Sequence, residues 1–148
     1  MKAVYTADMI CFLIQYDDPT QSVRRSPYVK QADGSWKKLS DPDDKGGTYY
    51  LKAEDKAAFD DSKFAPGDEV ASIMVEKFTG ERGVNDAALE YRNGKYTYVI
   101  ARKPVTGGKY DIRFKDLAAE HPFGFAAFDN AQVRHAVNGG VLKLKFAR

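Results

Sequence analysis

The sequence predicts an all-β fold, an antiparallel β-sandwich with a long irregular loop region and few short helices. Three observations favour it: about eight short segments have strand-like patterns, an Asn-Gly turn joins two of them, and no helical pattern exceeds about two turns. A length of 148 residues suits one domain, which we place over residues 1–148.

The first two strands are expected at Lys2–Thr6 and Met9–Tyr16. The second segment, MICFLIQY, is almost continuously apolar, which is typical of a strand buried on both faces. Asp17-Asp18-Pro19-Thr20 then ends it with turn-forming residues. Residues 21–63 are polar and rich in Pro and Gly, so we expect a long excursion with a helical turn within 51–60.

The strongest local signal is a hairpin formed by residues 87–92 and 95–103. Asn93-Gly94 joins them, and this dipeptide favours a tight turn in which both residues have positive φ. Side chains alternate along 95–103, so Tyr96, Tyr98 and Arg102 are expected on one face and Val99 on the other. Further strands are expected at residues 69–76, 110–114, 122–128 and 141–146.

Composition excludes several classes of protein. A single cysteine, Cys11, cannot form an internal disulfide, a CxxCH site or a cysteine-rich zinc module. No apolar run of roughly 18 residues is present, so we expect no transmembrane segment. The 23 basic and 21 acidic residues are mixed along the chain, which argues against nucleic-acid binding. No nucleophile–base pair or metal-ligand cluster is visible, so an independent enzyme is not indicated.

Two side chains could bind a metal. His135 follows an apolar strand pattern and precedes a Gly-Gly turn, so its ring nitrogen could reach a bound group. The thioether of Met74 is a soft ligand suited to haem iron. The alternatives are a surface histidine and a methionine that fills the core.

Several stretches carry a resemblance to a known family. They are Lys2–Tyr5, Cys11–Ser22, Asp33–Trp36, Glu54–Lys56, Asn93–Tyr96, Ile100–Lys103 and Phe123–Asn130 through His135. In their order and spacing the sequence resembles the haem-binding domain of the ethylbenzene dehydrogenase γ-subunit family, which is DOMON-like. The resemblance implies a β-sandwich that holds one non-covalent haem b, lies outside the cytoplasm and passes electrons to a redox partner protein. That partner would be a molybdenum enzyme or a multihaem cytochrome.

The resemblance also implies which residues bind the haem. Axial ligands in the family are methionine with lysine, and in DOMON cytochromes methionine with histidine. The lysine position falls in the segment after Asn130, where this sequence offers His135, with Met74 as its partner. Arg102 or Arg134 would pair with a propionate, and Phe128 would support the pocket.

Two other functions stay open at this stage. A carbohydrate-binding module would stack sugars on Trp36, Tyr49 and Tyr50 if those rings were exposed and coplanar. A cofactor-free interaction subunit would instead offer a strand at an open sheet edge to a partner.

Overall fold

The computed structural model describes residues 1–21, 25–40, 50–129 and 135–147, and these form an all-β fold, as predicted. In this part of the chain the helices are three short 3₁₀ segments, η1 (Ala53–Asp55), η2 (Asp61–Lys63) and η3 (Gly80–Gly83). The chain gathers into two compact units. Unit 1 comprises Met1–Thr20, Lys77–Phe125 and Asn138–Arg148, and unit 2 comprises Gln21–Glu76 and Ala126–Val137. The single-domain assignment stays a prediction.

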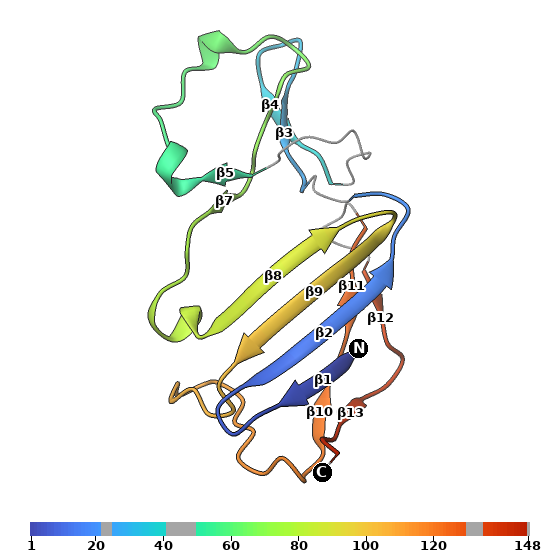
Figure 1. Cartoon of the computed structure of the whole chain (residues 1–148). Coiled ribbons are helices and arrows are strands. Elements are labelled where there is room, and N and C mark those ends of the chain that lie inside the picture. The colour runs from blue at the N-terminus through green and yellow to red at the C-terminus, as the bar shows by residue number, and fades with distance from the viewer. Residues whose placement is uncertain (22–24, 41–49, 130–134, 148) are drawn as a thin grey trace. The chain divides into compact units, whose positions relative to one another are not determined.

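Unit 1 is built on a four-stranded antiparallel sheet in the order β1-β2-β9-β8 (Figure 1). Its strands are β1 (Lys2–Tyr5), β2 (Ile10–Asp17), β8 (Asn85–Tyr91) and β9 (Lys95–Arg102). The two long central strands pair over their whole length, from Ile10 opposite Arg102 to Asp17 opposite Lys95. The sheet is therefore organised by one pairing between segments far apart in the chain.

The predicted hairpin is confirmed. Asn93 and Gly94 have φ values of 52° and 70°, and the flanking residues Arg92 and Lys95 exchange both backbone hydrogen bonds, at 2.9 and 3.1 Å. The predicted alternation also holds, because Tyr96 and Tyr98 stack on Tyr16 with ring centroids 5.2 and 6.1 Å apart.

A second layer covers one face of this sheet. The strands β10 (His121–Phe123) and β13 (Leu142–Leu144) form a two-stranded antiparallel sheet in the same unit. The core cluster of buried residues is Ile10, Phe114 and Phe146, packed against Ala3, Phe12, Leu117 and Leu144. Residues of both sheets meet in this cluster, so unit 1 is a small sandwich.

Unit 2 consists of short strands. In one sheet β3 (Tyr28–Lys30) lies between β4 (Trp36–Lys38) and β6 (Glu69–Val70). Another pairs β5 (Leu51–Lys52) in parallel with β7 (Met74–Val75), and the third joins β11 (Ala126–Ala127) to β12 (Ala136–Val137). The helical turn predicted within residues 51–60 is present as η1.

The strand predicted at 110–114 is wrong. In that segment the backbone bonds irregularly: the Phe114 amide donates to the Pro104 carbonyl at 2.9 Å, and the Ile112 carbonyl accepts from Arg102 Nη2 at 2.8 Å. These partners replace a strand ladder, although Phe114 is buried as a strand residue would be. The predicted strands at 69–76 and 122–128 each divide into two short strands, β6 with β7 and β10 with β11.

We expect Phe114→Ala to lower the free energy of unfolding of unit 1 by about 3–5 kcal/mol, because a large buried ring is lost. Phe114 is 6% exposed, and its ring contacts Phe12, Phe146 and His121. Urea titration followed by circular dichroism measures the change. Tyr110→Ala is the control, since that ring is 85% exposed and its loss should have little effect. Equal effects of the two substitutions would contradict this assignment of the core.

Candidate functional site

His135 directly precedes β12, at the loop end of the short hairpin that β11 and β12 form. Ala127 pairs with Ala136, and the next residues outward are Phe128 and His135. Their rings lie 4.6 Å apart with 31° between the planes. Both residues are exposed, and the imidazole lies against the Phe128 ring. An exposed histidine ring of this kind can bind a metal through a neutral ring nitrogen.

Met74 belongs to the same unit but to another sheet. It lies in β7 opposite Leu51 of β5, and its side chain is 53% exposed. It therefore does not fill a core. The structure places both predicted axial ligands in unit 2, and no ring contact or hydrogen bond joins Met74 to Phe128 or His135 among the described residues.

The two predicted arginines have different positions. Arg102 lies in β9 of unit 1 and is 9% exposed. Its Nη2 donates to the Ile112 carbonyl at 2.8 Å, and its guanidinium lies 5.6 Å from the centre of the Phe114 ring. These contacts tie Arg102 to the unit 1 core. Arg134 lies outside the described residues.

The described residues of unit 2 form no buried hydrophobic cluster. Among the described residues, the buried large apolar side chains lie in unit 1, with the exception of Pro27. Unit 2 instead exposes Tyr28, Tyr50, Leu51, Phe59, Met74, Val75, Phe128 and Val137. A small unit with so little buried apolar surface gains from stabilisation beyond apolar packing, which ion pairs, a bound prosthetic group or a partner can supply. Thioether and imidazole are both donor types that bind haem iron.

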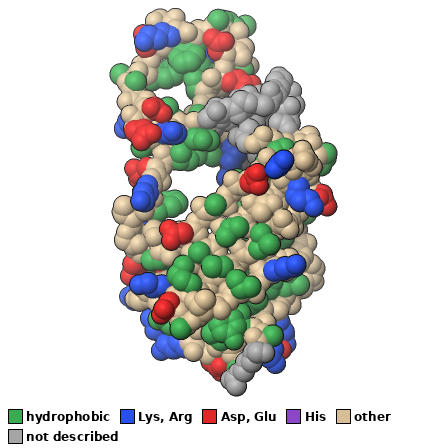
Figure 2. All heavy atoms as spheres, viewed as in Figure 1, with side chains coloured by type: hydrophobic (Ala, Val, Ile, Leu, Met, Phe, Trp, Pro, Cys, Tyr) green, Lys and Arg blue, Asp and Glu red, His purple; other side chains and the backbone are tan. Residues whose placement is uncertain are grey.

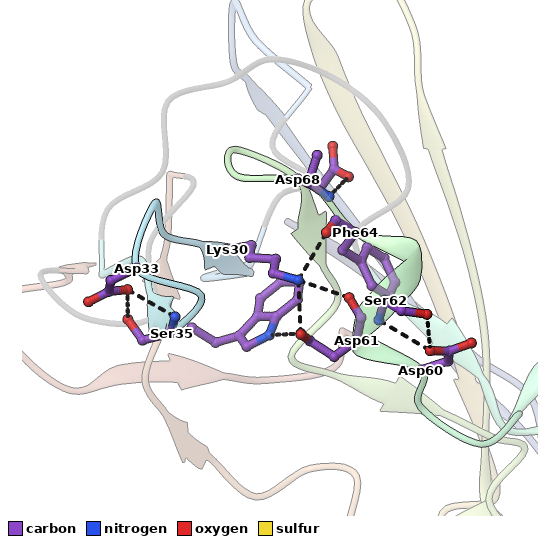
Figure 3. Close-up of polar contacts among 10 residues, drawn as sticks. Lys30, Asp33, Ser35, Asp60, Asp61, Ser62, Phe64 and Asp68 are labelled. Carbon is purple, nitrogen blue, oxygen red and sulfur yellow. Dashed lines mark hydrogen bonds and ion pairs between the residues drawn. The ribbon is translucent and has the colours of Figure 1, made fainter.

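A polar cluster that the sequence did not reveal holds unit 2 together (Figure 3). Lys30 Nζ donates to the Asp61 carbonyl at 2.8 Å, to Asp61 Oδ2 at 2.9 Å and to the Phe64 carbonyl at 2.9 Å. Its side chain is only 10% exposed. Trp36 Nε1 donates to Asp61 Oδ1 at 2.8 Å, so one carboxylate links β3, β4 and η2. Lys30 and Asp61 lie 31 positions apart in the sequence, which explains why no local pattern predicted the pair.

Trp36 belongs to this polar cluster, and its ring does not form a flat surface on which a sugar could stack. Its ring meets Phe59 and Phe64 edge-on, at interplanar angles of 72° and 82°. Sugar stacking needs an open ring face, and coplanar neighbours would be needed for an extended platform. This geometry disfavours the carbohydrate-binding interpretation. Tyr49, the second residue of that prediction, lies outside the described residues.

The described residues include neither a cluster of metal-binding side chains nor a membrane-spanning helix. No group of three or more His, Cys, Asp or Glu side chains there could hold a metal ion. No helix in the described chain is long and apolar enough to cross a bilayer.

Comparison with protein families shows to which family the chain belongs. The family model described as "Ethylbenzene dehydrogenase" matches residues 47–138, which is more than half of the chain. The chain belongs to this family. The match includes all five predicted site residues and leaves β1 and β2 outside it. Comparisons with curated proteins and with solved structures find no match.

We expect the Lys30–Asp61 pair to make unit 2 acid-sensitive. The pKa of Asp61 lies below its ordinary 3.8, chiefly through the hydrogen bond from Lys30 and then that from Trp36. A lowered pKa adds stability above the unfolded pKa, and this stability is lost as the pH falls through the folded pKa. Asp61→Asn should therefore destabilise unit 2 at neutral pH and differ progressively less from the unmodified chain below about pH 4.

Fluorescence of Trp36, the one tryptophan, reports this unit during urea titration at several pH values. Asp55→Asn removes an exposed carboxylate of the same unit and serves as the control. A stability difference for Asp61→Asn that does not change with pH would contradict the proposed role of the ion pair.

Proposed function

We propose that the chain is a non-catalytic electron-transfer subunit that binds one haem b outside the cytoplasm. Family membership supports the class of protein, because the chain matches the ethylbenzene dehydrogenase family over residues 47–138. The observation that carries the proposal is the exposed His135–Phe128 ring pair in the unit that also exposes Met74 and whose described residues form no buried hydrophobic cluster.

His135 and Met74 are the proposed axial ligands. Contact with Phe128 fixes the imidazole plane, which reduces the conformational entropy lost when the ring binds a metal. The exposed apolar side chains of unit 2 would cover the macrocycle and exclude water from it. Bound haem b supplies reversible one-electron chemistry, and a thioether ligand favours a higher reduction potential.

Attachment would be non-covalent. The sequence has a single cysteine, Cys11, and no CxxCH site for covalent attachment. Arg134 is the proposed propionate partner, since Arg102 already donates to a backbone carbonyl within unit 1. The proposed electron acceptor or donor is a molybdenum enzyme or a multihaem cytochrome, as the family relationship suggests.

We expect the purified chain to bind hemin with one-to-one stoichiometry and a shifted Soret band. His135→Ala should weaken binding by more than about tenfold, because a ligand is removed without change to a core. His121→Ala is a matched control: that second histidine lies in unit 1, where it packs on Phe114 and bonds the Asp116 carbonyl. Absorbance titration measures both variants.

Met74→Leu tests the second ligand while keeping the apolar volume. We expect hemin to remain bound with an altered spin state and a lower reduction potential, since the sulfur ligand is lost. Absence of a Soret shift in the unmodified chain would favour a cofactor-free interaction subunit instead. Equal weakening by His135→Ala and His121→Ala would remove His135 as a ligand.

A further inference from the structure

The unit 1 sheet has a second face that differs from its core face. The alternation of side chains places Ile10 and Phe12 toward β13 and turns their neighbours the other way. We call this other side the open face. It carries Lys2 and Val4 of β1, Cys11, Leu13, Gln15 and Asp17 of β2, Lys95, Thr97, Val99 and Ala101 of β9, and Asp86, Ala88 and Glu90 of β8.

The middle of the open face is apolar and accessible to solvent. Val4 is 66% exposed and Val99 42% exposed, and Leu13, directly opposite Val99, is half-buried. Figure 2 shows hydrophobic side chains gathered over this sheet. Contiguous apolar surface of this kind marks an interaction site in a folded protein.

The charges on the open face are segregated by strand. Lys2 lies on the β1 edge, whereas Asp86 and Glu90 lie on the opposite edge, β8, and all three are exposed. At one end of the central strands Asp17 of β2 and Lys95 of β9 form an ion pair at 3.3 Å. The open face therefore carries a basic residue at its β1 edge and acidic residues at its β8 edge. An ion pair lies at one end of its two central strands.

We propose that the open face binds the open face of a second copy of this chain, with a twofold axis that runs along the strands between β2 and β9. Rotation about that axis lays β1 of one copy over β8 of the other. Lys2 of the second copy then lies over Ala88, between Asp86 and Glu90. Leu13 meets Val99 of the second copy at the centre.

The same rotation also brings opposite charges together at the end of the open face that carries Asp17 and Lys95. Asp17 of each copy comes to lie over Lys95 of the other, because β2 and β9 exchange places. A one-pair slide along the strands would lose this apposition. Two face-to-face sheets pack about 10 Å apart and within about 30° of parallel, which suits an axis along the strands.

The charge pattern rejects the other face-to-face arrangement. An axis perpendicular to the strands would place β8 against β8, with Asp86 near Glu90 of the second copy, and β1 against β1. Like charges in close apposition cost free energy and exclude wrong pairings. The along-strand axis is thus selected by complementarity and not by apolar surface alone.

The area of the open face limits the affinity that the two copies can have for each other. Four strands about 4.8 Å apart, with four same-face rows of roughly 6.8 Å, give roughly 500 Å² per copy. The total of roughly 1,000 Å² is at the lower limit for a specific interface. We therefore expect reversible association in the micromolar range.

Sedimentation velocity of the full chain over about a hundredfold range of concentration should show monomer converting to dimer. Lys2→Glu should weaken the dimer roughly tenfold, because two charge appositions reverse per dimer. Lys2→Glu combined with Asp86→Lys and Glu90→Lys should restore it. Lys37→Glu, an exposed charge reversal in unit 2, is the control and should change nothing. All these positions are exposed, so the variants retain the fold.

Cys11 offers an independent readout in the unmodified chain. It is partly exposed on the open face, and the proposed axis brings the two copies of this cysteine within reach of a short bismaleimide cross-linker. We expect a cross-linked dimer that is lost in Lys2→Glu. A monomer at every concentration overturns the proposal, and so does a dimer that is insensitive to Lys2→Glu. Binding of this face to an unrelated protein by a chain that stays monomeric also overturns it. None of these outcomes depends on haem.

Discussion

The fold of unit 2 depends on the nearly buried ammonium of Lys30. A charged group with so little exposure is stable only when acceptors replace its water, and three oxygens from Asp61 and Phe64 do so. Because those acceptors lie in η2 and the segment after it, the contact joins strand β3 to a distant loop. Trp36 completes the cluster through the same carboxylate. The described part of unit 2 is thus organised by a polar centre, and no buried hydrophobic cluster is found among its described residues.

This polar centre has a consequence for the candidate site. If unit 2 were held by apolar packing, Met74 and Phe128 would be expected inside it. The Lys30 cluster connects β3, β4 and η2 without using Met74 or Phe128, and the side chains of these two residues stay exposed. Unit 1 has the opposite arrangement, since Ile10, Phe114 and Phe146 form its core. The guanidinium of Arg102 also packs on the Phe114 ring. Unit 1 therefore buries its apolar side chains, whereas unit 2 exposes the side chains that we propose as haem ligands.

What the sequence predicts correctly is local. The Asn93-Gly94 turn and the alternation of Tyr96 with Val99 follow from the backbone preferences of a few neighbouring residues. The segment 110–114 was mispredicted because its backbone groups bond outside any strand ladder: the Ile112 carbonyl accepts from the Arg102 side chain, and the Phe114 amide donates to the Pro104 carbonyl. The Lys30–Asp61 pair was missed for the same reason. His135 was singled out from its position after an apolar strand pattern and stays a proposed ligand. Its contact with Phe128 follows from the pairing of β11 with β12, which the sequence does not show.

The apolar continuity of β2 carries one more constraint. A strand that reads MICFLIQY is typical of burial on both faces, yet within unit 1 only Ile10 and Phe12 face the core cluster. Cys11 and Leu13 point to the open face, where an ordinary half-exposed strand would carry polar residues. Such a sequence is consistent when the open face is covered in the assembled protein. A second copy provides that cover with matching charges at its edges, and it accounts for a strand pattern that the isolated sheet leaves unexplained.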